Sequence, residues 1–129
     1  MSAITATGGT NRILQYGLYV VMALLTVAML FAGGMKLAGN KELWQQFVAF
    51  GYPYWFYILT GIIEAGAAIL LWPRQTRLIG AGLIVATMMG ALYSNMMVGA
   101  SQFYAVNIVV ATLAALVGWF NRNSWPLSR

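Results

Sequence analysis

Long apolar runs separated by short polar segments dominate the chain. Residues 13–35 carry no charge, residues 54–72 carry one, Glu64, and residues 78–121 carry none. An α-helix rises about 1.5 Å per residue and needs about 20 apolar residues to cross a hydrocarbon core of about 30 Å. The third run is about twice that length, so it predicts two helices with a break near residues 98–102. The pattern therefore predicts an all-α transmembrane four-helix bundle.

We expect a single membrane domain that covers residues 1–129. Its spans are expected at about residues 13–37, 54–72, 78–98 and 102–120. The polar residues 1–12 predict a flexible head, and residues 121–129 a C-terminal tail. The first apolar run exceeds the roughly 7 to 15 residues of a signal peptide's apolar core, which indicates a retained span.

Between the first two spans, residues 40–50 show helical periodicity of a different kind. Leu43, Trp44, Phe47, Val48 and Phe50 share one face, and charged or amide side chains occupy the other. Asn40 is a suitable N-cap, and Gly51 and Pro53 end the segment. The pattern predicts a short amphipathic helix at the membrane interface or over the mouth of the bundle.

Composition supports a lipid environment. The chain is 61% hydrophobic and 7% charged, whereas soluble domains are about 25% charged. The net charge of +5 comes from residues scattered at the ends of apolar runs, which disfavours nucleic acid as a partner and favours lipid headgroups. We expect the lipid bilayer as one partner, and another membrane protein or a second copy of the chain as the other.

Positive charges on the flanks predict the orientation. The N-terminus, the second loop and the C-terminus share one side and carry five arginines: Arg12, Arg74, Arg77, Arg122 and Arg129. The first loop on the other side has two lysines. Basic flanks favour the cytoplasm, so both termini are expected there, most simply in a bacterial inner membrane.

The chain contains no cysteine and no histidine. It therefore supplies no thiolate, no disulfide, and no Cys or His ligand for a metal or a haem. We expect no intrinsic cofactor and no metal site, and no motif for a self-contained enzyme is present. Any redox reaction would need a bound diffusible molecule, such as a quinone, or the redox group of a partner.

Glu64 is the most informative position because it lies near the middle of the second span. A charge there costs at least a few kcal/mol unless it is neutralised, hydrated or paired. Lys36, at the outer end of the first span, is the nearest cation, and its long stem can reach inward. We expect these two residues to pair, with a water or polar group between them if their depths differ, either as a structural lock or as part of a ligand site.

Further polar side chains fall in the same outer half. Asn95, Ser94 and Tyr93 lie near the end of the third span, and Asn107 lies early in the fourth. With Lys36 and Glu64, they are candidates for a ligand-binding pocket, although asparagine in a span often serves only as an interhelical hydrogen bond. Tyr52 and Tyr57 are expected to belong to the aromatic belt of the outer interface.

Small residues at a spacing of four predict where helices pack closely. The third span has the longest such stripe, Gly82, Ala86, Gly90 and Ser94, and the second span has Gly61 and Ala65. Such stripes are common in membrane helices. They predict tight packing without naming the neighbouring helix.

Several short motifs resemble the DoxX and DoxX-like family of small four-span membrane proteins. They are the GMKL sequence ending at Leu37, the GYP sequence at residues 51–53, the GIIE sequence ending at Glu64, and Thr76-Arg77. The resemblance covers roughly residues 28–91 and implies a four-helix bundle. It also implies a link to respiratory redox chemistry, since the family's namesake is the small subunit of a thiosulfate:quinone oxidoreductase. By position, Lys36 and Glu64 match the family's charged motif residues and Arg77 its basic loop residue.

Three functions remain open at this level. The leading one is a subunit or accessory factor of quinone-linked redox chemistry, with a small polar site in the outer half of the bundle. The second is a structural or assembly partner of another membrane protein. The third is a small-molecule or proton-coupled transporter that acts as an oligomer, because four spans alone are few to enclose a pathway.

Overall fold

The computed structural model describes residues 9–122, and these residues form helices joined by short connections, with no strand among them. The elements follow in the order α2 (Gly9–Leu37), α3 (Lys41–Phe50), α4 (Tyr54–Leu70), α5 (Arg77–Val98), the 3₁₀ turn η1 (Ser101–Phe103) and α6 (Tyr104–Phe120). The predicted all-α class is confirmed. The break expected near residues 98–102 is also present, where Gly99 ends α5 with a φ of 72°.

The first helix begins earlier than expected. The predicted flexible head divides into residues 9–12, which are the start of α2, and residues 1–8, which lie outside the described part of the chain. Polarity limits how far a helix enters the membrane, but it does not end the helix, because the backbone hydrogen bonds continue where no proline interrupts them. Of the predicted tail, residues 123–129 lie outside the described part.

Local chemistry explains the bounds of α3. The Asn40 side chain accepts a hydrogen bond from the backbone N–H of Leu43, at 3.0 Å, as an N-cap does. Gly51 ends the helix with a φ of 85°, a left-handed conformation that favours glycine, and its N–H bonds back to the carbonyls of Phe47 and Val48. Both predicted ends of this amphipathic helix are confirmed.

Three helical segments are each long and apolar enough to cross a membrane: Arg12–Leu37, Arg77–Val98 and Ser101–Phe120. α4 has 17 residues and meets the same test only together with α3, from which it is bent by 117°. At about 1.5 Å per residue, α4 is shorter than a hydrocarbon core of about 30 Å. The protein is therefore an integral membrane protein with three, or up to four, spans.

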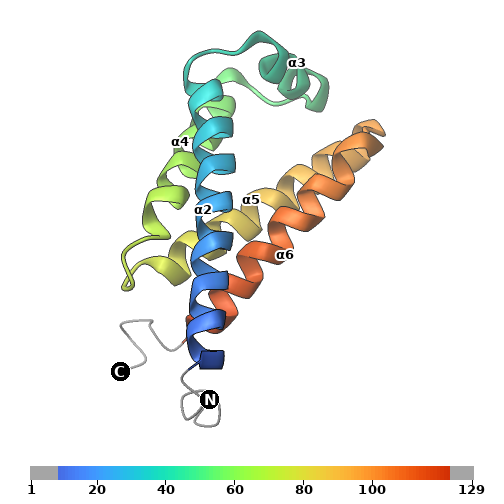
Figure 1. Ribbon diagram of the computed structural model, residues 1–129. Helices are drawn as coiled ribbons and strands as arrows, with labels where there is room; N and C mark the ends of the chain where they lie inside the picture. Colours follow the sequence, from blue (N-terminus) through green and yellow to red (C-terminus); the bar gives the residue numbers. More distant parts are fainter. Residues whose placement is uncertain (1–8, 123–129) are drawn as a thin grey trace.

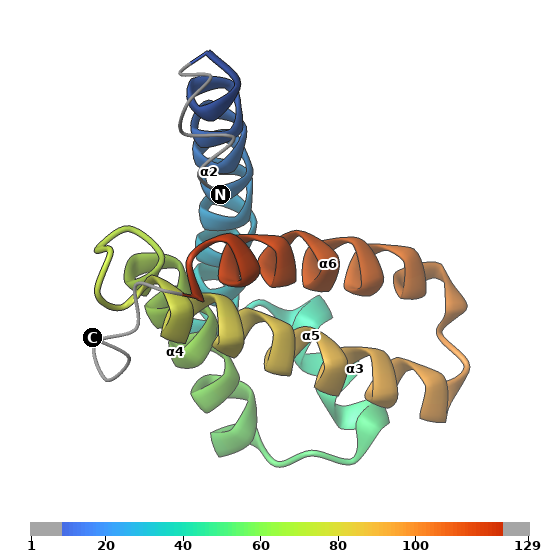
Figure 2. The same ribbon diagram turned by 90° about the horizontal axis from the view of Figure 1, so that it is seen from below.

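The long helices form two pairs that diverge at one end (Figure 1). α2 packs along α4, and α5 packs along α6, with further contacts between α4 and α5 and between α2 and α6. Figure 2 shows the two pairs crossing at a steep angle. α3 lies at the open end and contacts α2, α4 and α5. The opposite end holds the start of α2, the α4–α5 connection and the end of α6; we call it the arginine end, after Arg12, Arg74, Arg77 and Arg122.

One apolar core joins all four long helices. It contains buried residues of each helix: Met22, Leu25 and Met29 of α2; Ala67 and Ala68 of α4, and Leu71 directly after it; Ala81, Ile84 and Met88 of α5; and Ala111, Ala114 and Val117 of α6. Many large apolar side chains point outward, as lipid-facing side chains do; Val27 and Phe31, for example, are 69% and 67% exposed.

Close helix packing depends on glycines other than those of the longest stripe. A Cβ on Gly33 would lie 2.7 Å from the Gly61 carbonyl oxygen, and one on Gly80 would lie 2.8 Å from the Ala67 carbonyl oxygen. A Cβ on Gly82 or Gly90 would meet nothing within 4 Å. The close contacts of α2 with α4 and of α4 with α5 therefore require Gly33, Gly61 and Gly80, whereas the face of α5 that carries Gly82 and Gly90 is exposed.

Candidate functional site

A buried ion pair joins the end of α2 to the middle of α4. Lys36 Nζ donates to both carboxylate oxygens of Glu64, at 2.9 and 3.0 Å. The two residues are only 7% and 3% exposed. The expected pairing is therefore present, and the contact is direct, with no group between the two side chains.

Helix packing brings the two charges to the same depth. Gly61 lies one turn before Glu64 on α4, and a Cβ there would be 2.9 Å from the Lys36 Cβ. The missing side chain lets the Lys36 stem lie directly on α4, from where Nζ reaches the carboxylate. Lys36 also lies in the last turn of α2, where a cation interacts favourably with the helix dipole.

An aromatic cluster covers the ion pair from the open end. We call it the aromatic roof, and it consists of Trp44, Phe47, Phe50, Tyr52, Phe56 and Tyr57, linked by ring contacts with centroids 5.0 to 6.3 Å apart. The Phe47 ring lies 5.8 Å from Lys36 Nζ, a distance at which a cation is attracted to a ring face. Tyr57 is fully buried and its hydroxyl donates to the Asn40 carbonyl oxygen at 3.0 Å, so α4 holds the start of α3 in place.

The second helix pair contributes an amide pair at the same end. Asn95 Nδ2 of α5 donates to Asn107 Oδ1 of α6 at 2.9 Å, and both residues are buried. Beside them, the hydroxyl groups of Ser94 and Tyr52 are hydrogen-bonded at 2.7 Å. This bond ties the α3–α4 connection to α5, so the roof is attached to both helix pairs.

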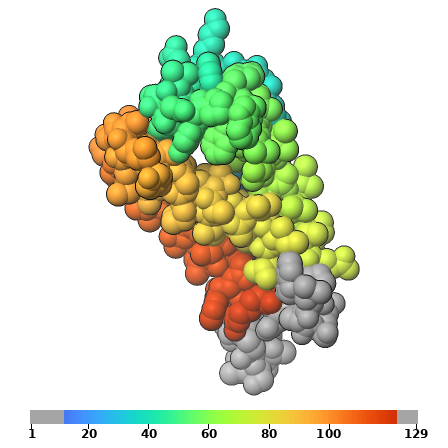
Figure 3. All heavy atoms as spheres, turned by 180° about the vertical axis from the view of Figure 1, so that it is seen from behind, coloured from blue at the N-terminus to red at the C-terminus, as the bar shows by residue number. Residues whose placement is uncertain are grey.

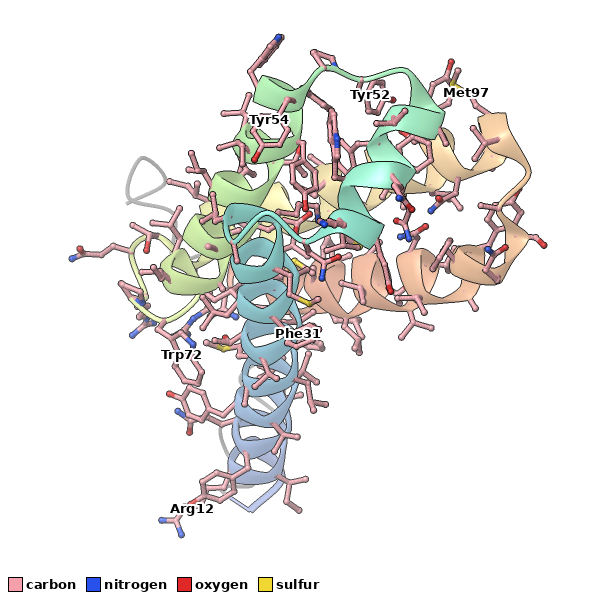
Figure 4. The ribbon with its side chains drawn as sticks, turned by 90° about the horizontal axis from the view of Figure 1, so that it is seen from above. Arg12, Phe31, Tyr52, Tyr54, Trp72 and Met97 are labelled. Carbon is pink, nitrogen blue, oxygen red and sulfur yellow. The ribbon has the colours of Figure 1, made fainter. Side chains whose placement is uncertain are left out.

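We refer to the buried polar residues of this end together as the polar layer: Lys36, Glu64, Ser94, Asn95 and Asn107. The roof meets this set at Lys36, through Phe47, and at Ser94, through Tyr52. Seen from above, α3 lies between α4 and the α5–α6 hairpin, with Tyr52 beside it (Figure 4). From behind, the surface is hollowed between the end of α3 with the start of α4 and the yellow part of α5 (Figure 3). Every buried side-chain nitrogen and oxygen of the described residues has a hydrogen-bond partner.

The structure joins four of the five candidate residues named from the sequence in two separate pairs, Lys36 with Glu64 and Asn95 with Asn107. Tyr93 does not join them, because its side chain is 64% exposed on the outer face of α5. Tyr52 and Tyr57 were expected in the aromatic belt, but they turn inward as parts of the roof. The contact of Phe47 with Lys36 was not predicted from the sequence. The turn at Gly51 and Pro53 was the available signal, since it folds the chain back between α3 and α4.

The profile of the DoxX-like family matches residues 20–117, well over half of the chain. The chain belongs to the DoxX-like family. All four residues Lys36, Glu64, Asn95 and Asn107 lie within the matched region of this DoxX-like chain, as does the whole aromatic roof. Comparison with curated proteins gives no significant match. Comparison with solved structures gives none either.

Proposed function

We propose that this DoxX-like protein is a membrane subunit or accessory factor of quinone-linked respiratory redox chemistry, and that the polar layer receives the quinone head. The observation that carries the proposal is the buried Lys36–Glu64 pair beneath an aromatic roof. Ionisable groups at membrane depth mark ligand or proton sites more often than ionisable groups elsewhere. The family's link to respiratory redox chemistry favours a quinone over other ligands.

The polar layer has the groups that a quinone head requires. A quinone presents two carbonyl oxygens, which accept hydrogen bonds. Lys36 carries three N–H groups and uses two of them on the carboxylate oxygens of Glu64, so one remains for a quinone oxygen. Asn95 carries two amide N–H groups and uses one of them on Asn107, so it can also donate one. The rings of the roof offer flat apolar faces for the quinone ring, and the hollow between the start of α4 and α5 (Figure 3) would receive an apolar tail.

Electrons must come from a partner protein in this proposal. Quinone reduction consumes two electrons and two protons, and the chain has no cysteine or histidine to hold a redox centre. Lys36 donates a hydrogen bond to a carbonyl oxygen, while the Glu64 carboxylate holds the Lys36 ammonium group in place, and both protons come from water. The redox-active partner supplies both electrons, so the protein works as a subunit.

The topology belongs to the same proposal. α4 also crosses the membrane, as the second of four spans, both termini are cytoplasmic, and the membrane is a bacterial inner membrane. Two observations support this arrangement: the start of α2 and the end of α6 lie at the same end of the molecule, and that end carries Arg12, Arg74, Arg77 and Arg122. An even number of spans is required if both termini are on one side, and basic residues favour the cytoplasmic side.

Quinone retention tests the proposal. The full-length protein is purified from a quinone-containing membrane, and the co-purified quinone is extracted and measured per chain. We expect retention in the wild type and a loss of at least about tenfold in Lys36→Met/Glu64→Gln, which removes the Lys36 donor without leaving a buried charge, because one good charged hydrogen bond is worth about 1.5–3 kcal/mol. Lys41→Met is the matched control, since Lys41 is exposed at the start of α3. Equal retention in both variants, or no quinone in the wild type, would contradict the proposal.

A role as an assembly partner is the second candidate, and the exposed small-residue face of α5 favours it. Gly82, Ala86 and Gly90 are exposed, and Gly82 lines a shallow groove of about 350 Å³ between α5 and α6. Helices in lipid associate where small residues allow close approach. Gly90→Leu should then abolish co-purification of a membrane partner or a second copy while quinone retention stays unchanged; if co-purification is unchanged as well, the face is not an interface.

A further inference from the structure

The arginine end contains a cavity of about 310 Å³ between the first turns of α2, the α4–α5 connection and the end of α6. Its polar lining includes Gln15 and Tyr19 of α2, Arg74 and Arg77 of the connection and of α5, and Asn121 after α6. We propose that this cavity binds the headgroup of an anionic phospholipid.

Charge is the first argument. Arg74 and Arg77 both line the cavity, whereas the chain has only two acidic side chains, Glu42 in α3 and Glu64 in α4. Glu64 is bonded to Lys36, and α3 lies at the opposite end of the molecule. Neither carboxylate therefore neutralises the two guanidinium groups, and a basic pocket between membrane helices is suited to a phosphate headgroup.

Hydrogen bonding within the protein leaves donors for that phosphate. Arg77 donates through Nε to the Leu71 carbonyl oxygen, through one terminal nitrogen to Asn121 Oδ1 and through the other to the Trp72 carbonyl oxygen. These bonds use three of its five N–H groups and fix the guanidinium at the wall of the cavity. Arg74 is exposed and bonds to no residue of the described part of the chain, so its five N–H groups remain for a ligand.

The apolar part of the lining selects a lipid over a soluble phosphate. Leu14, Leu18 and Met22 of α2 and Phe120 of α6 complete the cavity wall, and α2 continues from there into the apolar span. Tyr19 is held against Trp72 by ring stacking, with centroids 6.5 Å apart and planes at 9°. A diester phosphate would meet the guanidinium groups while its acyl chains follow the outer face of α2.

Native mass spectrometry tests the proposal. The full-length protein is released from nanodiscs made of equal amounts of phosphatidylglycerol and phosphatidylcholine, and the lipids retained per chain are identified. We expect preferential retention of phosphatidylglycerol, reduced about fivefold in Arg74→Gln and restored in Arg74→Lys, since one basic side chain near an anionic surface contributes a factor of about that size. Arg12→Gln is the matched control, because Arg12 has the same charge at the same end and does not line the cavity.

Three outcomes would overturn the proposal. Equal loss in Arg12→Gln and Arg74→Gln would mean diffuse attraction to the membrane surface. Displacement of the lipid by excess inorganic phosphate would mean a site for a soluble anion. Equal retention of both lipids by the wild type would mean that the cavity has no selectivity for charge. The thermal unfolding midpoint of Arg74→Gln serves as a folding control. If it equals that of the wild type, the reduced lipid retention is not caused by unfolding.

Discussion

At the end of the molecule that α3 covers, Lys36 and Glu64 are buried and bonded to each other, whereas at the arginine end Arg74 is exposed and bonded to no described residue. The first end is neutral and internally satisfied. The second keeps a net positive charge and an open cavity. The comparison teaches that an enclosed charge depends on a partner within the protein, whereas an exposed charge does not. Substitution of Lys36 should therefore lower the stability of the protein far more than substitution of Arg74.

The largest effect is expected from breaking the ion pair. Lys36→Met leaves the Glu64 carboxylate buried without its cation, which costs about 3–5 kcal/mol. Because the double variant Lys36→Met/Glu64→Gln leaves no uncompensated charge, it should recover much of that loss. Thermal unfolding in detergent, followed by circular dichroism for the single and double variants, measures the coupling. Additive losses would show that the two side chains contribute independently and would contradict an enclosed pair.

The next largest effect is expected from the glycine contact that brings α2 onto α4. Gly33→Ala places a Cβ 2.7 Å from the Gly61 carbonyl oxygen and 2.9 Å from the Ala65 nitrogen. Backbone atoms cannot move aside alone, so the helices must separate, at a cost of about 1–3 kcal/mol. Thermal unfolding in detergent measures this loss of stability. Gly34→Ala is the adjacent control, since a Cβ there meets nothing within 4 Å; equal midpoints for the two variants would exclude a tight contact at Gly33.

A smaller effect is expected at the bond that ties the roof to α5. Tyr52→Phe removes the 2.7 Å hydrogen bond with Ser94, at a cost of about 1 kcal/mol. The loss should be local, so that amide hydrogen exchange of α3 accelerates while exchange in the core of α2 does not change. Tyr93→Phe is the control, because the Tyr93 side chain is exposed. Uniform acceleration along the chain would mean that α3 does not open as a separate unit.

The sequence predicted the helices and the ion pair for the same physical reason. Apolar runs of span length must be helical in lipid, and a carboxylate within such a run needs a partner, for which Lys36 was the nearest cation. The side on which a residue faces was harder to predict. Tyr93, Ser94 and Asn95 are consecutive, so they point in different directions around α5, and a helix with lipid on its outer face shows little contrast between apolar and polar sides.

The arrangement of the helix pairs was not predictable from the small-residue pattern. Gly80 makes the close contact with α4, whereas Gly82, Ala86 and Gly90 of the longer stripe face outward and only its last member, Ser94, is buried. Both patterns satisfy the same spacing rule, and only the fold distinguishes them. The roof depends on three features together: an amphipathic α3, a left-handed Gly51, and the Tyr52 hydroxyl that reaches α5. The sequence predicts the first two features but not the third.

The smallest effect on stability is expected at the arginine end. Arg74→Gln removes a charge that no described residue bonds, so the unfolding midpoint should change by no more than the equivalent of about 0.5 kcal/mol. Arg77→Gln should cost more, because Arg77 joins the end of α4 to the end of α6 through Leu71, Trp72 and Asn121. Since both arginines line the same cavity, unfolding in neutral detergent separates their roles: a large loss for Arg74→Gln would place that side chain among the structural contacts and remove the contrast between the two ends.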